Sequence, residues 1–456
     1  MEYAELTNRY PVFYYHDFAL IESDDEFRVQ YDFEIEGLSH FNPDFIIPKP
    51  AGGGLFGNLR NVRVAAFSLG MVELISYWKM TCSPHVIVEC GALSSQQISW
   101  WKNLYYQGLD EFFAHNGIDA DPEGFMDLSS SGDVITGQID QRRFFGNLIP
   151  VGGGKNSFVT LELLKDTKED NHTFVISHVM SAIHAAFAAG YRGEHLIIAD
   201  RSLDSRMLEF NKRGFLNGPT PFSALCAFAA SLTAIIYGIQ NICLSNEDIL
   251  GQQADNENYL HLQYSKTFAF EQDFKQYMDT WITPEVHYFS VLRPVSDLQI
   301  AGLFATLKQY HPVFRSCNVG QKEEKWCGHC LRCLLTCIML SAYLDDEALV
   351  EIFHSDMLND PQMREMFDEL TGASDNHPAG CSGIREEVNV AICMSIRRHE
   401  HAGSGLPLLY REYQTSSYYD FYRGKSVDWD HFNPQNYVPE QYSCLLKNWL
   451  MERKTV

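Results

Sequence analysis

The chain has few basic residues for its size. Lysine and arginine together number 35 against 59 aspartates and glutamates, so the formal net charge is −24 at pH 7. Proteins that bind nucleic acid neutralise its phosphates with Lys and Arg, and no local basic patch is visible here. We therefore expect no nucleic-acid partner.

Long hydrophobic runs are scarce as well. Residues 1–6 are acidic and lack the basic and apolar segments of a signal peptide. The segment closest to a membrane span, residues 221–239, carries no charge, starts with a proline and contains Ser223, Ser231 and Thr233. It lies between two predicted strands, so a buried helix explains it better than a membrane span. We expect a cytoplasmic protein with no membrane partner.

The sequence contains no repeat and no low-complexity segment. Its composition, 45% hydrophobic and 21% charged, is that of a globular protein, and 456 residues are enough for two or three domains. The 12 cysteines are unevenly spaced. In a chain without an export signal, reduced thiols and metal ligands are a better interpretation than disulfides.

Three consecutive glycines mark the stretch around which we expect the fold to be organised. An apolar run that ends at Val151 is typical of a buried parallel strand, and the apolar residues after Ser157 suit a helix packed on a sheet. Asn156 and Ser157 are both suitable caps for that helix. Between strand and helix lie Gly152, Gly153, Gly154 and Lys155.

A strand, a glycine turn and a helix start together make an anion site. The backbone N–H groups point outward there, and the helix dipole adds positive potential. Glycine lets the backbone approach a phosphate, and Lys155 adds a point charge. The pattern is neither a Walker loop nor Gly-x-Gly-x-x-Gly, and an ordinary glycine turn is the alternative. A second glycine triplet, residues 52–54, follows no apolar strand and is interpreted as a loop.

Residues 1–145 are predicted to form an α+β region. Apolar and polar residues alternate over 27–35, as in a half-buried strand. Helices are predicted at 62–78 and 100–116, and a short strand at 86–89. The aromatic stripes of this region suit a core better than a ligand site, and we find no catalytic constellation in it.

Residues 146–340 alternate between strand and helix patterns, which predicts an α/β domain with a parallel sheet and helices on both faces. Beyond the glycine loop, strands are predicted at 173–177, 196–199, 242–244 and 287–291, with helices at 178–189 and 221–239. Ligands of such sheets bind beyond the carboxyl ends of the strands. Polar residues follow these predicted ends, namely Asp200, Arg201, Ser245, Asn246, Glu247 and Arg293. They predict one shared site with the glycine loop, although ordinary polar strand ends would look the same.

Four cysteines near the end of this domain form a second strong signal. Cys327, Cys330 and Cys333 have the spacing Cys-x2-Cys-x2-Cys, and Cys317 precedes them. Four thiolates suit a structural zinc ion in a closed tetrahedral site. An iron–sulfur cluster needs the same ligands and is the alternative. Cys337 lies on a predicted helix and is interpreted as a spare thiol.

Residues 341–456 are predicted to form a helical C-terminal region, with helices at 344–353, 361–370 and 384–396. A small-residue loop containing Cys381 precedes the last of these helices. The tail is rich in tyrosine and other aromatic residues, which is untypical of disorder, so we expect it to pack on the body.

The motifs occur in an order that resembles a known family. The glycine loop is similar to the pyrophosphate loop of ATP pyrophosphatases, and a four-cysteine knuckle after such a loop is similar to that of 7-cyano-7-deazaguanine synthases. The motifs that carry the resemblance also include three further segments, residues 244–247, 263–266 and 288–294. From about residue 60 to 390 the chain resembles the MurL family of UDP-N-acetylmuramoyl-L-alanyl-L-glutamate epimerases.

The resemblance implies a pyrophosphate-loop domain, similar to the adenine nucleotide alpha hydrolases, and an epimerisation that consumes ATP with Mg²⁺. Such an enzyme adenylates the α-carboxylate of the terminal glutamate, inverts Cα and hydrolyses the adenylate, giving AMP and pyrophosphate. ATP is expected at residues 152–157, Ser245 and Asn246, and structural Zn²⁺ at the four cysteines. Glu247, Lys266, Arg293 and Cys381 are the expected catalytic residues, with Cys381 as a proton-transfer group and Lys266 and Arg293 as stabilisers of the enolate.

Three segments depart from the family pattern. Asn156 stands where the family has an aspartate, Pro219 where a histidine is expected, and the loop around Cys381 lacks both flanking acids. These changes indicate a divergent member, with another substrate or a weak activity as open alternatives. A ligase or amidase that captures the adenylate, and a nucleotide-binding protein without catalysis, are the competing hypotheses. For Cys381, a purely structural role in a tight loop is the other interpretation.

Overall fold

One large sheet runs through the N-terminal two thirds of the chain. The computed structural model describes residues 2–50, 59–248, 259–261, 263–320, 323–374 and 383–454. The strands of this sheet are β1 (Val12–Glu22), β2 (Glu26–Ile35), β3 (Ser39–Phe41), β4 (Asp44–Pro48), β5 (His85–Val88), β6 (Asp127–Ser130), β7 (Phe145–Pro150), β8 (Asn171–Ile176), β9 (Leu196–Arg201), β10 (Ile239–Leu244) and β12 (His287–Ser290). Their spatial order is β12-β10-β7-β8-β9-β4-β2-β1-β5-β6, and β3 pairs with β2.

The half of the sheet from β12 to β9 is parallel, as predicted. Taken in chain order from β7, its strands lie in the spatial order 3-2-1-4-5, which is that of doubly wound α/β folds. The order reverses between β7 and β10. In such sheets this reversal opens a crevice at the carboxyl ends of the two strands, where ligands bind.

The N-terminal strands continue the same sheet and do not form one of their own. β4 pairs with β9 in antiparallel register, Phe45 opposite Arg201, and β2 is antiparallel to both β4 and β1. The alternation predicted for 27–35 is confirmed, since every second side chain of β2 from Phe27 to Ile35 is buried. The expected boundary at 145/146 therefore does not separate two sheets.

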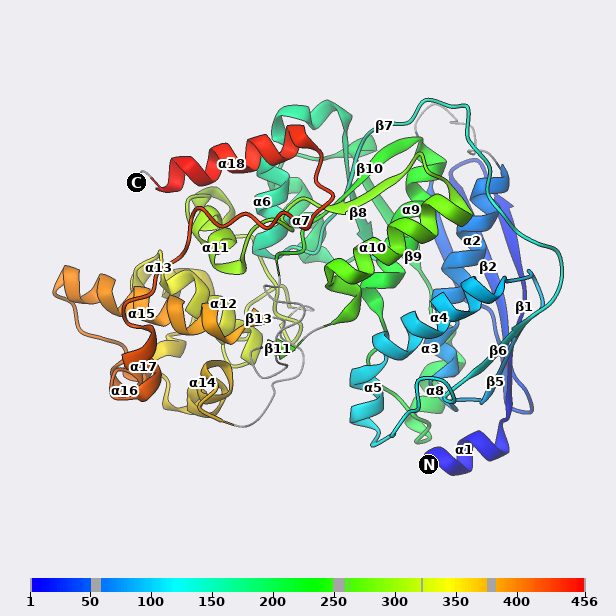
Figure 1. Ribbon diagram of the computed structural model, residues 1–456, viewed down its shortest axis with the longest axis horizontal. Coiled ribbons are helices and arrows are strands. Elements are labelled where there is room, and N and C mark those ends of the chain that lie inside the picture. Colours follow the sequence, from blue (N-terminus) through cyan, green and yellow to red (C-terminus); the bar gives the residue numbers. More distant parts are fainter. Residues whose placement is uncertain are drawn as a thin grey trace.

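Helices cover both faces of the parallel half, as predicted (Figure 1). Leu148 of β7 points into a core shared with α2 (Leu59–Glu73), α4 (Ser95–Gly108), α9 (Phe222–Tyr237) and α10 (Phe268–Tyr277). Its neighbour Ile149 points into the opposite core, which includes α6 (Lys155–Leu163), α7 (Met180–Ala188), α11 (Asp297–Ala305) and α12 (Leu331–Ser341). Successive side chains of a strand point to opposite faces, so one strand contributes to both cores.

The uncharged stretch at 221–239 is the helix α9, and it is buried as predicted. Gly238 ends it in the left-handed conformation, with φ +69°. Among the described residues, no helix combines the length and apolar character needed to cross a bilayer.

Two predicted helices are each divided in the structure. The helix expected at 62–78 begins earlier, as α2, and a break at Leu74 separates it from α3 (Ile75–Trp78). The helix expected at 100–116 is α4 followed by α5 (Asp110–His115), with Leu109 between them. Other short elements are α1 (Tyr3–Arg9), α8 (Ser205–Lys212) and the antiparallel pair of β11 (Tyr259–His261) with β13 (Gly383–Ile384), the second of which lies in the C-terminal region.

The C-terminal region is helical, as expected. Its helices are α13 (Asp346–Phe353), α14 (Arg364–Thr371), α15 (Arg385–Ala402), α16 (Leu408–Tyr413), α17 (Ser417–Tyr422) and α18 (Glu440–Lys454). The aromatic tail returns to the body, because α18 packs on α6 and α11 (Figure 1). The Tyr442 hydroxyl donates to Asn147 Oδ1 of β7 at 2.8 Å, so the tail reaches the central strand of the parallel half.

Candidate functional site

The glycine loop joins β7 to α6 at the point where the strand order reverses. β7 ends at Pro150 and α6 begins at Lys155, with Gly154 as its N-cap in an extended conformation. Gly153 has φ +85°, and a Cβ there would lie 2.8 Å from the carbonyl oxygen of Ser181. This position accepts glycine only, because a side chain would meet the backbone of α7.

The expected side-chain cap of this helix is absent. Neither Asn156 nor Ser157 caps α6, because the helix begins two residues earlier than the hydrophobic pattern indicated. Instead the Ser157 hydroxyl accepts a hydrogen bond from the Gly152 N–H at 3.2 Å and so closes the loop from within. The carbonyl of Gly153 accepts from the Arg315 N–H at 2.7 Å, which ties the loop to the segment before the cysteine knuckle.

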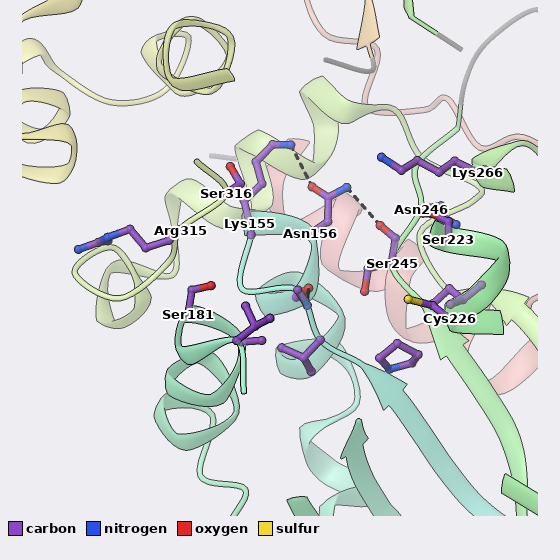
Figure 2. A pocket seen from close by; sticks show the side chains of 18 of the residues that line it. Lys155, Asn156, Ser181, Ser223, Cys226, Ser245, Asn246, Lys266, Arg315 and Ser316 are labelled. Atoms are coloured by element: carbon purple, nitrogen blue, oxygen red, sulfur yellow. Dashed lines mark hydrogen bonds between the residues drawn. The ribbon is translucent and has the colours of Figure 1, made fainter. Parts of the chain in front are cut away.

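Side chains of the loop connect β7 to β10 across the point of reversal. The Asn156 side-chain amide donates to the Ser245 carbonyl at 3.2 Å and to Glu247 Oε2 at 2.9 Å. Lys155 Nζ donates to Asn156 Oδ1 at 2.9 Å and forms an ion pair with Asp297 at the start of α11. Figure 2 shows Lys155, Asn156 and Ser245 in this chain of hydrogen bonds.

A pocket of about 490 Å³ opens above the loop. The glycine loop, the end of β8, residues 244–247, the first turn of α9 and the segment 315–318 line it. Figure 2 shows Lys266 and Cys226 on one side and Arg315 and Ser181 on the other. Four cationic side chains, Lys155, Lys266, Arg315 and Arg332, and three carboxylates, Glu247, Asp297 and Glu324, line this pocket. The pocket therefore offers a ligand both cationic and anionic groups.

The Ser245 hydroxyl is a specific indication that a ligand binds here. Its oxygen is buried and has no hydrogen-bond partner in the part of the chain that the structure describes. Burying a hydroxyl without a partner costs free energy, so such atoms in a pocket commonly meet a ligand or water. Ser245 directly follows β10 and lines the pocket beside the glycine loop.

The structure brings most of the predicted site residues together. Gly152, Gly154, Lys155, Asn156, Ser157, Ser245, Asn246, Glu247 and Lys266 all line the pocket. Arg201 is not among them. Its guanidinium pairs with the buried Glu73 of α2 at 2.8 Å, which links α2 to the end of β9.

Arg293 has a different environment from the one expected. The residue is 1% exposed, does not line the pocket and pairs with Glu271 Oε2 at 3.2 Å. Its guanidinium also donates to the carbonyls of Glu247 at 2.6 Å and Lys266 at 2.8 Å. Arg293 thus holds the backbone of two pocket residues instead of reaching a substrate. Burial raises the pKa of the Glu271 carboxyl, and the nearby Arg293 opposes that rise.

Asp248 is also occupied within the protein. Its carboxylate is buried and accepts hydrogen bonds from His431 at 2.9 Å and Asn433 at 2.8 Å, both from the C-terminal tail. The hydrogen bond to Asp248 raises the pKa of His431, while burial opposes that rise. Asp248 is therefore a docking point for the tail, and Glu247 is the acid of this loop that faces the pocket.

Several residues of the pocket, among them Asp297, Ser223 and Cys226, were not predicted from the sequence. Asp297 pairs with Lys155 although 142 positions separate them, and Ser223 and Cys226 enter the pocket from the first turn of α9. Burial raises the pKa of the Cys226 thiol to about 12, so this group is protonated near neutral pH. Polar residues on an otherwise apolar helix could have drawn attention to Ser223 and Cys226, whereas nothing local marks Asp297.

The four predicted cysteines converge on one point. The sulfur–sulfur distances are 3.8 Å for Cys317–Cys330, 3.6 Å for Cys327–Cys333 and 3.4 Å for Cys330–Cys333. A tetrahedral ion with Zn–S bonds of about 2.3 Å separates its sulfurs by roughly 3.8 Å, so the set fits a single zinc ion. An iron–sulfur core is larger and would hold the four thiolates farther apart. Cys337 is buried on α12 outside this set.

The sequence predicts Cys381 as a proton-transfer group. Cys381 lies outside the described residues, and so do its neighbours Gly380 and Ser382. β13 follows this loop and pairs with β11, and only the backbone of the two strands is described.

The fold and the pocket define a doubly wound α/β protein with a glycine-rich loop at the reversal of its strand order. The chain belongs to the MurL family: the MurL N-terminal domain matches residues 4–291 and the MurL C-terminal domain matches residues 313–415. The N-terminal match includes the glycine loop and residues 244–247, and the C-terminal match includes the four cysteines.

Three relatives share the name UDP-N-acetyl-alpha-D-muramoyl-L-alanyl-L-glutamate epimerase. The protein from Xanthomonas oryzae is 26% identical over 351 residues, covering 75% of this chain and 77% of its own. Those from Salinispora tropica and a Micromonospora species are 28% and 27% identical, and each alignment covers 79% of this chain and 79% or 80% of the relative. No solved structure matches the chain.

Proposed function

We propose that the protein is a cytoplasmic, ATP-dependent epimerase of peptidoglycan precursor synthesis. It adenylates the terminal L-glutamate carboxylate of UDP-N-acetylmuramoyl-L-alanyl-L-glutamate with release of pyrophosphate, inverts Cα and hydrolyses the adenylate, so that water restores the carboxylate and AMP leaves. The family and the names of the relatives support the epimerisation. The observation that most supports the use of ATP is the glycine loop, which leads into α6 at the reversal of the strand order.

Adenylation has a clear chemical purpose in this reaction. Removing the Cα proton beside an ionised carboxylate would create a dianion, which is very costly. An acyl adenylate carries no charge at its carbonyl, so the electrons left by the proton spread onto that oxygen as an enolate, which hydrogen-bond donors stabilise. A base on one face of Cα and an acid on the other complete the inversion.

The pocket residues divide into roles by their position. The N–H groups of the glycine loop, with Lys155, bind the phosphates of ATP, and Ser245 and Asn246 complete the nucleotide site. Lys266 faces the pocket from another segment and stabilises the enolate or the substrate carboxylates. Arg293 is a positioning residue, because its contacts are to the backbone of Glu247 and Lys266.

Two metal ions belong to this proposal. Glu247, beside Asn156, offers the pocket a carboxylate for Mg²⁺, a hard cation that prefers oxygen ligands and neutralises phosphate charge. Zn²⁺ on Cys317, Cys327, Cys330 and Cys333 has a structural role, because four thiolates leave no open position for substrate.

The test is incubation of the protein with ATP, Mg²⁺ and UDP-N-acetylmuramoyl-L-alanyl-L-glutamate in D₂O, followed by chiral and mass analysis. We expect D-glutamate in the product, one deuterium at Cα and stoichiometric AMP. A control without ATP should show no exchange. A product of altered mass would instead identify a ligase or amidase, and ATP binding without AMP would identify a non-catalytic relative.

The same assay tests Cys381 as one of the two proton-transfer groups. Thiols act in this way when a nearby helix start or cation lowers their pKa. Cys381→Ser should leave ATP binding and AMP formation intact while it suppresses the appearance of deuterium at Cα. Deuterium exchange at the unmodified rate would show that this thiol is structural.

A further inference from the structure

Two histidines and a glutamate meet on the N-terminal part of the sheet, on strands that do not line the pocket. His16 belongs to β1, Glu34 to β2 and His40 to β3. Their side-chain ligand atoms all lie within 4.8 Å of one another. Figure 1 shows β1 and β2 on the side of the molecule opposite the C-terminal helices.

The two imidazole rings present the same nitrogen to the same carboxylate. Nε2 of His16 lies 2.8 Å from Glu34 Oε2, and Nε2 of His40 lies 3.3 Å from that oxygen. Ligands bound tetrahedrally at 2.0–2.1 Å lie about 3.3 Å apart. The His40–Glu34 pair has this spacing already. The His16–Glu34 distance of 2.8 Å is shorter than this spacing. A small rotation of the Glu34 side chain, which is 24% exposed, would lengthen it to the same value.

Each histidine is oriented through its other ring nitrogen. His16 Nδ1 lies 2.7 Å from Glu89 Oε2 of the loop after β5, and His40 Nδ1 lies 3.4 Å from Asp32 Oδ1. A carboxylate on the second nitrogen is the arrangement that fixes the tautomer and direction of metal-binding histidines. Both His16 and His40 have a carboxylate on the second ring nitrogen. A chance cluster of charged side chains on a surface would not need this arrangement.

The backbone also directs His16 toward this point. The register between β1 and β2 shifts between Tyr15 and Asp17, so His16 is the extra residue of a β-bulge. Bulges re-aim side chains and are common beside functional sites. The rings of His16 and His40 are stacked, with centroids 5.7 Å apart, and the Tyr14 ring also stacks with His16 at 5.0 Å.

We propose that His16, Glu34 and His40 form a binding site for a borderline divalent cation such as Zn²⁺, separate from the four cysteines and from the pocket. Two imidazoles and one carboxylate are a common ligand set for zinc, with the fourth position left to water. The bound ion would cross-link β1, β2 and β3. This site is independent of the proposed enzymatic function.

Cobalt(II) distinguishes this site from the cysteine site, because thiolate ligands give charge-transfer absorption in the near ultraviolet and imidazole or carboxylate ligands do not. The full chain, carrying zinc on its cysteines, is titrated with Co²⁺ and then analysed for metal after gel filtration. We expect one additional ion per chain, with visible ligand-field bands and no thiolate band. Absence of an additional ion in the unmodified protein overturns the proposal.

Variants locate the ion. His16→Gln and His40→Gln should each abolish the additional uptake, and Glu89→Gln, which removes only the orienting carboxylate, should weaken it about ten- to a hundredfold. His85→Gln is the matched control, because His85 pairs with Asp127 at 3.2 Å on the neighbouring strand without a second histidine. Circular dichroism confirms that each variant is folded. Equal uptake by His16→Gln, His40→Gln and the control would also refute the site.

Discussion

Lys155 is the residue whose charge the proposed ATP site depends on most directly. It follows the glycine loop, lines the pocket and is held there by Asp297 and Asn156. A charge-assisted hydrogen bond contributes about 1.5–3 kcal/mol. Lys155→Ala should therefore weaken ATP binding by roughly ten- to a hundredfold, measured by calorimetric titration.

The control for this substitution is Lys165→Ala, which removes an exposed lysine paired with Glu162 just beyond the same helix. It should leave ATP affinity unchanged. If Lys155→Ala bound ATP as tightly as this control, the glycine loop would not be the phosphate site.

Asn156 determines how many carboxylates face the proposed Mg²⁺. Its amide donates to Glu247 at 2.9 Å, whereas an aspartate would place a second negative charge beside that carboxylate. Carboxylate oxygens are better Mg²⁺ ligands than amide oxygens. Asn156→Asp should lower the Mg²⁺ concentration required for half-maximal AMP formation.

A matched control for this charge change is Asn318→Asp, in the segment of the pocket lining that belongs to the cysteine knuckle. This variant should not lower the Mg²⁺ requirement. An unchanged or raised requirement in Asn156→Asp would indicate that the metal is held by other groups.

Glu387 is a buried carboxyl near the start of α11. One oxygen accepts from the Leu298 N–H at 2.7 Å, and burial, reinforced by the charge of Asp297, raises its pKa well above the ordinary value of 4.5. The folded state therefore binds this proton more tightly than the unfolded state. The proton on Glu387 makes its full contribution to the free energy of unfolding below pH 4.5. This contribution is lost as the pH rises through the raised pKa of the folded state.

Glu387→Gln removes this pH dependence. Relative to the variant, the unmodified protein should lose free energy of unfolding as the pH rises above 4.5, measured by urea unfolding at several pH values. Glu386→Gln, which changes the neighbouring glutamate paired with Lys425, should follow the unmodified protein. Parallel pH profiles for Glu387→Gln and the unmodified protein would contradict this assignment.

At the scale of elements, the cysteine knuckle joins the segment before it to α12. Cys317 lies in the segment before α12 and Cys333 lies on α12, so a bound ion connects two parts of the chain. Metal binding then contributes directly to folding free energy. Cys330→Ser should lose the zinc found by metal analysis and melt at a clearly lower temperature.

Cys337→Ala is the appropriate control, since this buried thiol lies on the same helix four positions after Cys333 and is not in the ligand set. It should retain a full equivalent of zinc. Carefully purified protein without zinc, or a Cys330→Ser variant that keeps it, would argue against the site.

At the scale of the whole molecule, the C-terminal tail is hydrogen-bonded to the residues that follow β10. His431 and Asn433 both bond to the buried carboxylate of Asp248, the residue after Glu247. His431→Ala would leave this charge with one partner fewer. Leaving a buried polar group with an unmet hydrogen bond costs about 1–3 kcal/mol, and we expect a loss of that size in urea unfolding.

The exposed His401 is a suitable control for the tail, because His401→Ala changes a histidine at the end of α15. The free energy of unfolding of this variant should differ from that of the unmodified protein by no more than about 0.5 kcal/mol. Faster limited proteolysis of the tail in His431→Ala would link the loss of stability to release of the tail from the body. Equal free energies of unfolding for His431→Ala and His401→Ala would contradict the role of His431.

Patterns carried by neighbouring residues could be predicted from the sequence alone. The alternation in β2, the strand and helix around the glycine loop, and the spacing of Cys327, Cys330 and Cys333 each depend on local geometry. The order of strand and helix patterns also predicted a parallel sheet with helices on both faces. That prediction succeeds because connections between parallel strands must cross a face of the sheet.

Contacts between distant residues were decided only by the tertiary structure. Lys155 meets Asp297, Arg293 turns away from the pocket toward Glu271, and β4 joins the N-terminal strands to β9. Polar residues after a strand look alike in sequence whether they face a ligand or a neighbouring loop. Which of them is buried depends on the packing of elements that lie far away along the chain, because burial is a property of the whole fold.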